Sequence, residues 1–533
     1  MPAAPHSEVL PETAAINQLG HLAVGGCDTL DLAARFGTPL IVYDQEHLRS
    51  RCREALAAFP GGVSYATKAF TCRAMAALAH DEGLTLDVAS AGEFLAARSA
   101  GVPADRLVVH GNNKSVAELQ LALEQGVHRI AIDSADEFGR ISALVQGGYP
   151  PPDAWLRINP GVATDTHPSI ATGHSQSKFG VLAGAAATDQ LIQRILSTGS
   201  VRLRGIHMHM GSQIRDLEVY EAAVRRILPY LRRWDLPELC VGGGLAVAYT
   251  ELEPSPSVAS FAEAIRRACQ DTLPNLTLSC ELGRWIAATA GITLYTIGTV
   301  KHTPGGTAIA AVDGGMADNM RVALYGANYQ VLAPDRPRTH ECPVTVVGKH
   351  CESGDILARD VLLPKHLAAG DILCSLVTGA YGYSMASSYN RLGRPAVVFA
   401  ANGRATAVLR RETPADMMNL DVWPTLELAV WLPVRLLFWL PARDGCSKIV
   451  GRTGFEPVTS SGSGKFRTVW VSVTVGLSRA GALTRANIPG GSGWVRRRLI
   501  ALALICGSHG FGLPVEQDRQ GRGGSCYLSG LRC

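Results

Sequence analysis

Lys68 ends a strand-like run, Val63–Lys68, and a lysine in that place can do covalent chemistry. The run has the pattern of a buried strand and is followed by turn-forming residues. Burying an ammonium group is costly unless the group is paired or its pKa falls. A neutral amine at a dry strand end can form a Schiff base with a carbonyl group. Lys68 is therefore a candidate for holding a carbonyl cofactor, although most lysines at strand ends simply reach solvent.

Glu281 and Arg284 form a second group of interest. Glu281 closes another strand-like segment and is followed within three residues by Arg284. A carboxylate that faces a pyridine nitrogen keeps that nitrogen protonated, which makes the ring a strong electron sink. The alternative is that Glu281 simply pairs with Arg284 at the start of a helix.

The segment His207–Ser212 adds two histidines and a serine. His209 could stack on a planar ring, and Ser212 could donate a hydrogen bond to a phosphate. His207 and His209 would share one face of a strand, so they could instead be core residues or zinc ligands, but no third ligand is obvious nearby. Further along, Gly242–Gly244 would let a phosphate approach backbone N–H groups.

Strand-like segments alternate with amphipathic helical stretches between residues 60 and 290. Eight such units predict a closed (β/α)8 barrel of the TIM type. The alternative, an open doubly wound sheet, would normally contain fewer strands. The eight strands that we expect are Val63–Lys68, Leu84–Ala89, Leu107–His110, Arg129–Asp133, Ala154–Asn159, Leu203–Met208, Leu239–Val241 and Leu276–Cys280.

A barrel of this kind carries its chemistry at the C-terminal ends of its strands. Polar residues or glycines close all eight expected strands, which irregular loop sequence would rarely produce. One end of the barrel would therefore gather every group introduced above. The closing residues are Lys68, Asp87, His110, Asp133, Asn159, His209, Gly242–Gly244 and Glu281.

Length and composition set further bounds. A chain of 533 residues holds two or three domains, and 47% hydrophobic residues supply ample core. The formal net charge of +4 is too small to predict binding to nucleic acid or to an anionic membrane. The 13 cysteines form no CxxC pair, and the chain begins with polar residues instead of an apolar signal. We therefore expect a cytoplasmic protein.

The sequence predicts four regions. Short β-rich segments with Gly and Pro turns follow the barrel and predict an antiparallel β-domain. We expect residues 1–44 to join this β-domain, 45–292 to form the barrel and 293–417 to form the β-domain itself. Residues 418–533 form a basic tail, with 14 Lys and Arg against 5 Asp and Glu from residue 423 onward. The tail holds no recognisable motif, so we expect it to be disordered; attachment to a membrane surface is the alternative.

Short motifs spread over residues 20 to 415 resemble the pyridoxal-phosphate-dependent decarboxylases of the alanine-racemase fold, and among these the diaminopimelate decarboxylases. Each motif is short, but together and in this order they are highly specific. They are Tyr65–Ala69, Leu86–Glu93, His110–Lys114, Ser177–Gly180, His209–Gln213, Gly242–Gly244, Glu281–Arg284, Asp313–Met316, Leu324–Ala327, Cys351–Asp355 and Gly379–Gly382.

The resemblance implies that pyridoxal 5′-phosphate is the cofactor, held covalently by Lys68 with His209 packed on its ring. Leu282 stands where the family usually has proline, and Met210 stands where Ile or Val is usual. Neither change removes a functional group. The other cofactor-binding residues are expected to be Asp87, Ser212, Gly243, Gly244, Glu281, Leu282, Gly283, Arg284 and Tyr381.

The resemblance also implies decarboxylation of an amino acid by a homodimer. Two protomers would pack head to tail, and the β-domain of each would complete the active site of its partner. Cys351 is the expected acid that protonates the substrate carbon after CO2 leaves.

Substrate choice should depend on the end of the substrate that does not react. Arg284 and Arg321 offer guanidinium groups for a distant carboxylate. Glu352 offers a charge for a distant ammonium group, and Tyr325 and Tyr381 could add hydrogen bonds. This set fits a substrate with an amino-carboxylate at both ends, so we expect meso-diaminopimelate to yield L-lysine and CO2.

Three alternatives remain. A decarboxylase of ornithine, arginine or lysine would leave Arg321 without a partner. A racemase would need a second acid or base on the opposite face and would lack the Cys-Glu pair. A regulator without catalytic activity would be expected to have lost Lys68 or Cys351, and both are present.

Overall fold

The computed structural model describes residues 8–162, 177–269, 275–304, 307–422, 436–441 and 466–471. Contacts between residues divide the chain into two units, Met1–Asp421 and Val422–Cys533. The second unit is described only as an antiparallel strand pair, β22 (Leu436–Pro441) with β23 (Phe466–Val471). The rest of the predicted tail after residue 422 lies outside the described residues, so its disorder stays a prediction.

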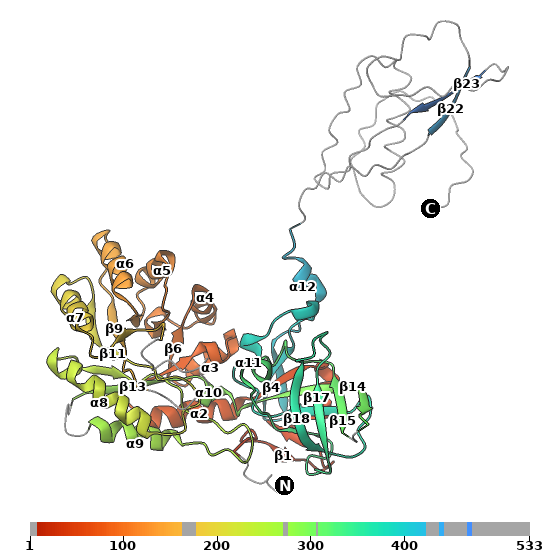
Figure 1. Cartoon of the computed structure of the whole chain (residues 1–533), viewed down its shortest axis with the longest axis horizontal. Helices are drawn as coiled ribbons and strands as arrows, with labels where there is room; N and C mark the ends of the chain where they lie inside the picture. The colour runs from red at the N-terminus through yellow and green to blue at the C-terminus, as the bar shows by residue number, and fades with distance from the viewer. Residues whose placement is uncertain are drawn as a thin grey trace. The chain divides into compact units, whose positions relative to one another are not determined.

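Eight parallel strands in the first unit form a closed ring and confirm the predicted (β/α)8 barrel (Figure 1). The ring closes where β8 pairs with β9 and where β13 pairs with β5. A closed ring excludes an open doubly wound sheet, so that alternative is wrong. The strands are β5 (Val63–Ala66), β6 (Thr85–Val88), β7 (Leu107–Val109), β8 (Arg129–Ile132), β9 (Asp153–Asn159), β11 (Arg202–His207), β12 (Glu238–Cys240) and β13 (Thr277–Leu282), and a short β10 (Val181–Leu182) pairs with β9.

Helices surround the strand ring (Figure 1). Three of them begin in the same way, because Ser90, Ser115 and Ser134 each accept a hydrogen bond of 3.2 Å from the backbone N–H three residues later. These serines satisfy N–H groups that the first helical turn leaves open, and they fix where each helix starts. The helices are α2 (Gln45–Ala58), α3 (Arg73–Asp81), α4 (Ala91–Ser99), α5 (Val116–Gln125), α6 (Ala135–Gln146), α7 (Ala186–Thr198), α8 (Glu218–Arg233), α9 (Val258–Cys269) and the short α10 (Arg284–Ala287).

A second large sheet forms the predicted β-domain and is mostly antiparallel, with parallel pairing at β15–β17 and β4–β20. Its longest strand, β14, pairs with β4, β15 and β19 and so holds the sheet together. The strands are β4 (Leu40–Asp44), β14 (Gly291–His302), β15 (Ala308–Val312), β16 (Val331–Leu332), β17 (Cys342–Val347), β18 (Ile356–Leu363), β19 (Ile372–Ser375), β20 (Ala396–Ala401) and β21 (Arg404–Leu409).

The N-terminal segment contributes to this sheet through β4, which lies between β14 and β20. All five residues of β4 are buried, and one hydrophobic cluster runs from them into the barrel. Before β4, a small three-stranded sheet, β1 (Ala15–Ile16), β2 (Leu22–Val24) and β3 (Cys27–Asp28), leads into α1 (Thr29–Phe36). Two further short helices, α11 (Arg321–Tyr325) and α12 (Pro414–Met418), complete the unit.

Among the described residues, no helix combines the length and the apolar character that crossing a bilayer requires.

Candidate active site

Lys68 lies directly after β5, in the 3-10 turn Thr67–Ala69, so the strand is shorter than predicted. Its side chain is exposed, yet it lies within electrostatic reach of Tyr381, Asp87 and Glu281. Loss of hydration lowers the pKa of Lys68, but the effects of Tyr381 and Asp87 outweigh it and raise this pKa above its ordinary value. The neighbouring groups therefore favour the charged form of Lys68, which is the paired alternative to a neutral amine.

Glu281, at the end of β13, is held by two histidines. Nε2 of His207 lies 2.8 Å from its Oε2, and Nε2 of His110 lies 2.8 Å from its Oε1. Burial raises the pKa of Glu281, but the two histidines more than compensate and bring it well below its ordinary value. Glu281 is therefore a carboxylate. No ion pair between Glu281 and Arg284 is present, so the alternative based on that pair is wrong.

The same three side chains could be considered as a metal site, because the ligand atoms of His110, His207 and Glu281 lie within 4.8 Å of one another. This arrangement differs from the pair of His207 and His209 considered from the sequence. Two ligands at ordinary zinc distances in a tetrahedron lie roughly 3.3 Å apart. The observed nitrogen–oxygen separations of 2.8 Å are shorter and match a direct hydrogen bond to His207 and an ion pair with His110.

Asp87 extends this network. Its Oδ1 lies 3.9 Å from Nε2 of His110, and both side chains are buried. Burial is the main cause that raises the pKa of Asp87 to about 6, and the nearby Glu281 adds to it. Asp87 therefore gains or loses a proton more readily near neutral pH than an ordinary aspartate does.

His209 is half-buried and follows β11. Its Nδ1 accepts a hydrogen bond of 3.2 Å from the N–H of Gly243. Burial lowers its pKa far below the ordinary value, and Lys68 and Arg157 lower it further. These effects favour the neutral imidazole.

The three glycines after β12 are required by close packing of the backbone. A Cβ atom at Gly243 would collide with the carbonyl oxygen of Glu281, and one at Gly244 would collide with that of Gly211. Gly244 also has a positive φ of 104°. Because the N–H of Gly243 already binds His209, Gly244 is the better candidate for an amide that contacts a phosphate.

Arg284 binds neighbouring hydroxyl groups. Its Nε and Nη2 donate to Oγ of Ser212 at 3.2 and 2.9 Å, and its Nη1 donates to the hydroxyl of Tyr249 at 2.6 Å. Its guanidinium carbon lies 4.6 Å from the centre of the Tyr381 ring. The structure thus brings Ser212, Arg284 and Tyr381 together.

The turn that carries Lys68 packs against the end of β13 and against Tyr381. The N–H of Tyr381 donates to the carbonyl of Ala69 at 2.8 Å, and Tyr381 has a strained φ of 62°. Leu282 is buried, and a Cβ atom at Gly283 would lie 3.0 Å from the Cβ of Ala69. Leu282 and Gly283 therefore support the turn through packing.

Arg321 is buried between two tyrosine rings. Its guanidinium carbon lies 4.4 Å from the centre of the Tyr249 ring and 5.6 Å from that of Tyr329, whose hydroxyl accepts a hydrogen bond from Nη1. Its Nε is buried and finds no hydrogen-bond partner among the described residues. Tyr325 ends the short helix that Arg321 begins.

Cys351 and Glu352 lie on the turn between β17 and β18, and both are exposed. Two contacts hold the turn in place. The N–H of Cys351 donates to Oδ1 of Asn390 at 2.9 Å, and Nδ1 of His350 lies 2.8 Å from Oδ2 of Asp355. Within the described chain, no hydrogen bond or ion pair joins Cys351 or Glu352 to the Lys68 turn. The structure thus brings together the barrel residues and leaves these two apart.

Sequence reasoning missed several residues of the site. Arg157 lies on β9 two residues before a predicted closing residue, and its guanidinium carbon lies 4.3 Å from the centre of the Phe179 ring. Tyr249 and Tyr329 fall outside the motifs, and no spacing could have indicated Tyr249, which lies 35 residues from Arg284 in the sequence. His110 was named as a strand end and within a motif but not as a site residue, although it directly contacts Glu281.

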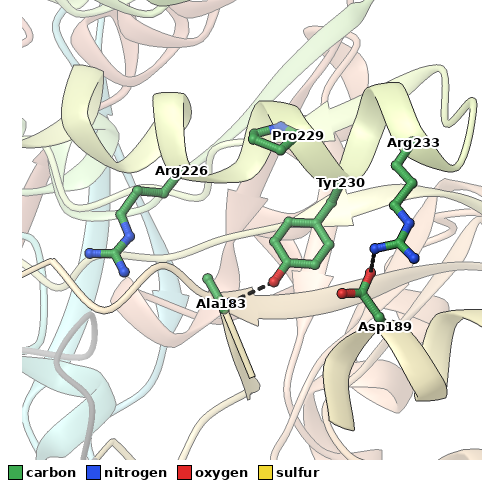
Figure 2. A pocket seen from close by; sticks show the side chains of 7 residues that line it. Ala183, Asp189, Arg226, Pro229, Tyr230 and Arg233 are labelled. Atoms are coloured by element: carbon green, nitrogen blue, oxygen red, sulfur yellow. Dashed lines mark hydrogen bonds and ion pairs between the residues drawn. The ribbon is translucent and has the colours of Figure 1, made fainter. Parts of the chain in front are cut away.

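A surface pocket of about 320 Å³ lies elsewhere, between α7 and α8 (Figure 2). The hydroxyl of Tyr230 accepts a hydrogen bond there from the N–H of Gly184, and Arg233 pairs with Asp189 at 3.2 Å. None of the strand-end residues lines it. We therefore place the candidate active site at the barrel end.

The residues at the barrel end fit pyridoxal phosphate. Oε1 of Glu281 is buried and has no well-aligned hydrogen bond within the described chain, so it can accept one from a protonated ring nitrogen. Lys68 presents an exposed amine, and His209 presents a neutral ring. Ser212 and Arg284 supply donors for an anion.

The sequence matches a known family of enzymes. Residues 45–288 match the family described as pyridoxal-dependent decarboxylase, pyridoxal binding domain. A diaminopimelate decarboxylase of Actinosynnema pretiosum is 44% identical over 76% of this chain and 93% of its own length. That of Bacillus subtilis is 42% identical over 76% and 96%. The chain therefore belongs to the diaminopimelate decarboxylase family.

Solved structures of diaminopimelate decarboxylases resemble this chain in fold as well as in sequence. The crystal structure of diaminopimelate decarboxylase from M. jannaschii is 31% identical, covers 78% of this chain and 98% of its own, and superposes with a TM-score of 0.73. The enzyme from Helicobacter pylori, complexed with L-lysine, is 29% identical over 74% of this chain and 99% of its own, with a TM-score of 0.69.

Proposed function

We propose that this protein decarboxylates meso-diaminopimelate to L-lysine and CO2 with pyridoxal phosphate as its cofactor. The observation that carries the proposal is the buried Arg321, which is held between two tyrosines and keeps an unused Nε. A guanidinium group built in this way is suited to a carboxylate that takes no part in the reaction. Similar proteins bear the name diaminopimelate decarboxylase, and one is solved with the product L-lysine.

Each barrel residue has a role in this proposal. Bound pyridoxal phosphate would supply the electron sink that the loss of CO2 requires. Lys68 would hold the cofactor's carbonyl carbon, and Glu281, kept ionised by its histidines, would hold the proton on the ring nitrogen. His209 would cover one ring face. Ser212, Gly244 and the turn that contains Arg284 would bind the phosphate end and the pyridine end of the cofactor.

Cys351 and Glu352 would act from the partner protomer of a homodimer. Their exposure on the β17–β18 turn supports this, because the turn is free to face a second chain. Cys351 would deliver the proton to the substrate carbon, and Glu352 would bind the distant ammonium group. Arg321 and Tyr325 would bind the distant carboxylate. All nine cysteines among residues 8–422 that are described are free, which supports a reducing cytoplasm as the location.

The test is release of CO2 by the full chain loaded with pyridoxal phosphate. We expect turnover of meso-diaminopimelate and little or none of L-lysine or L-ornithine, because neither offers Arg321 a second carboxylate. Faster turnover of ornithine or lysine would favour the alternative of a basic amino-acid decarboxylase. No release from any of the three would favour a regulator without catalytic activity.

A further inference from the structure

His110 lies between two carboxylates that belong to different strands. Its Nε2 is 2.8 Å from Oε1 of Glu281 and 3.9 Å from Oδ1 of Asp87. All three side chains are buried. The shorter contact brings opposite charges together, but the two atoms are not aligned for a hydrogen bond, and neither finds another partner among the described residues.

His207 holds the other oxygen of Glu281 differently. Its Nε2 makes an aligned hydrogen bond of 2.8 Å to Oε2, and the ring of Trp155 stacks on it at 19° with 6.3 Å between the ring centres. Burial lowers the pKa of His207 to about 4, so its imidazole is neutral and donates through N–H. One oxygen of Glu281 therefore accepts an aligned hydrogen bond from His207, whereas the other is held only by the ionic contact with His110.

We propose that His110 is a positioning residue that occupies Oε1 of Glu281 until the cofactor's ring nitrogen takes that oxygen, after which His110 pairs with Asp87. The inference rests on the proposed function, because the competing N–H belongs to pyridoxal phosphate. One carboxylate oxygen can accept two hydrogen bonds, but a pyridinium and an imidazolium that share it bring two positive charges close together and repel each other. Asp87 supplies the second anion that lets His110 turn away at little cost.

The charges around His110 support this role. Burial lowers the pKa of His110, but Asp87 and Glu281 outweigh it and raise that pKa above its ordinary value. Asp87, whose pKa is raised to about 6, becomes the better partner for this cation once Glu281 is engaged by the ring.

The experiment compares His110→Phe with the matched variant His207→Phe, because phenylalanine keeps a ring of similar size and removes the N–H donor. Cofactor is removed from the full chain, and the dissociation constant of pyridoxal phosphate is measured by absorbance. Loss of a competitor should make H110F bind about tenfold tighter than the original protein, whereas loss of an aligned donor should make H207F bind about tenfold weaker. An analogue with carbon in place of the ring nitrogen should bind the original protein and H110F equally.

Other outcomes overturn the proposal. Weaker binding of pyridoxal phosphate by H110F, or an equal gain in affinity for the analogue, would show that His110 only supports the fold. If H110F does not fold, Asp87→Asn provides the test. This variant should weaken the binding of pyridoxal phosphate more than the binding of the analogue, and an equal loss for both would refute the proposal. In each case, CO2 release by the original protein reports separately on the proposed function.

Discussion

The barrel end and the β17–β18 turn hold their reactive groups in opposite ways. In the barrel, Glu281 and its two histidines are buried and joined by contacts of 2.8 Å. On the turn, Cys351 and Glu352 are exposed, and the backbone N–H of Cys351 donates a hydrogen bond to Oδ1 of Asn390. A buried network is arranged by one chain alone. An exposed pair on a firmly anchored turn is suited to completing a site on another chain.

Lys68→Ala should have the largest effect, since it removes the only proposed covalent link to the cofactor. We expect complete loss of turnover and of the absorbance band that the cofactor gains on binding Lys68, with an unchanged circular dichroism spectrum. Lys365→Ala, at an exposed position, is the control. A normal band in the Lys68 variant would remove this residue from the site.

Cys351→Ala should lower kcat strongly while cofactor affinity stays the same, because the residue is proposed to act after CO2 leaves. Mixing it with Lys68→Ala should restore part of the activity, since a mixed dimer would contain one intact site. Cys342→Ala, on the neighbouring strand β17, is the control. Mixed dimers without activity would show that each chain builds its site alone.

Arg321→Met should lower kcat/KM for meso-diaminopimelate by about 30- to 1,000-fold, or 2–4 kcal/mol, mainly through a higher KM. The variant keeps a long side chain between Tyr249 and Tyr329 but loses the charge. Arg202→Met, at the opposite end of β11, should leave the kinetics unchanged. Equal kinetics of both variants would contradict the proposed substrate contact.

Ser115→Ala should destabilise the barrel by about 1 kcal/mol without affecting the kinetics, because it removes a helix cap. Urea unfolding followed by circular dichroism measures this difference. Ser99→Ala, an exposed position at the end of α4, is the control and should change stability less. A loss of activity in S115A would mean that the cap also supports the site.

Deleting residues 423–533 should have the smallest effect. The eight barrel strands, the β-domain and every proposed site residue precede this point. We expect a stable and fully active enzyme, and limited proteolysis of the full chain should stop near the same length. A truncated protein that loses activity would show that the second unit takes part in the function.

The barrel fold and several residues of the candidate site could be predicted from the sequence, because the barrel repeats one simple unit of a strand followed by a helix. Alternating strands and helices indicated eight strands, and polar residues at their ends indicated Lys68, His209 and Glu281. What the sequence could not predict is which of these residues contact one another. Glu281 is held by His110 and His207 instead of the nearby Arg284, because ring closure brings β7 and β11 close to β13.

The direction of the pKa shift of Lys68 could not be predicted from the sequence either. A lysine at a strand end suggested a neutral amine, but its pKa depends on Asp87, Glu281 and Tyr381, which are distant along the chain. Only the assembled site shows that these groups outweigh the loss of hydration.

Ring closure between β5 and β13 has a consequence for synthesis of the protein. The strands that carry Lys68 and Glu281 are the first and the last of the barrel, yet they are direct neighbours in the sheet. A ribosome-bound chain exposes its reactive amine long before the carboxylate has been made. Cofactor bound at that stage would lack Glu281, the carboxylate proposed to keep its ring nitrogen protonated. The nascent chain therefore cannot catalyse decarboxylation before its barrel is closed.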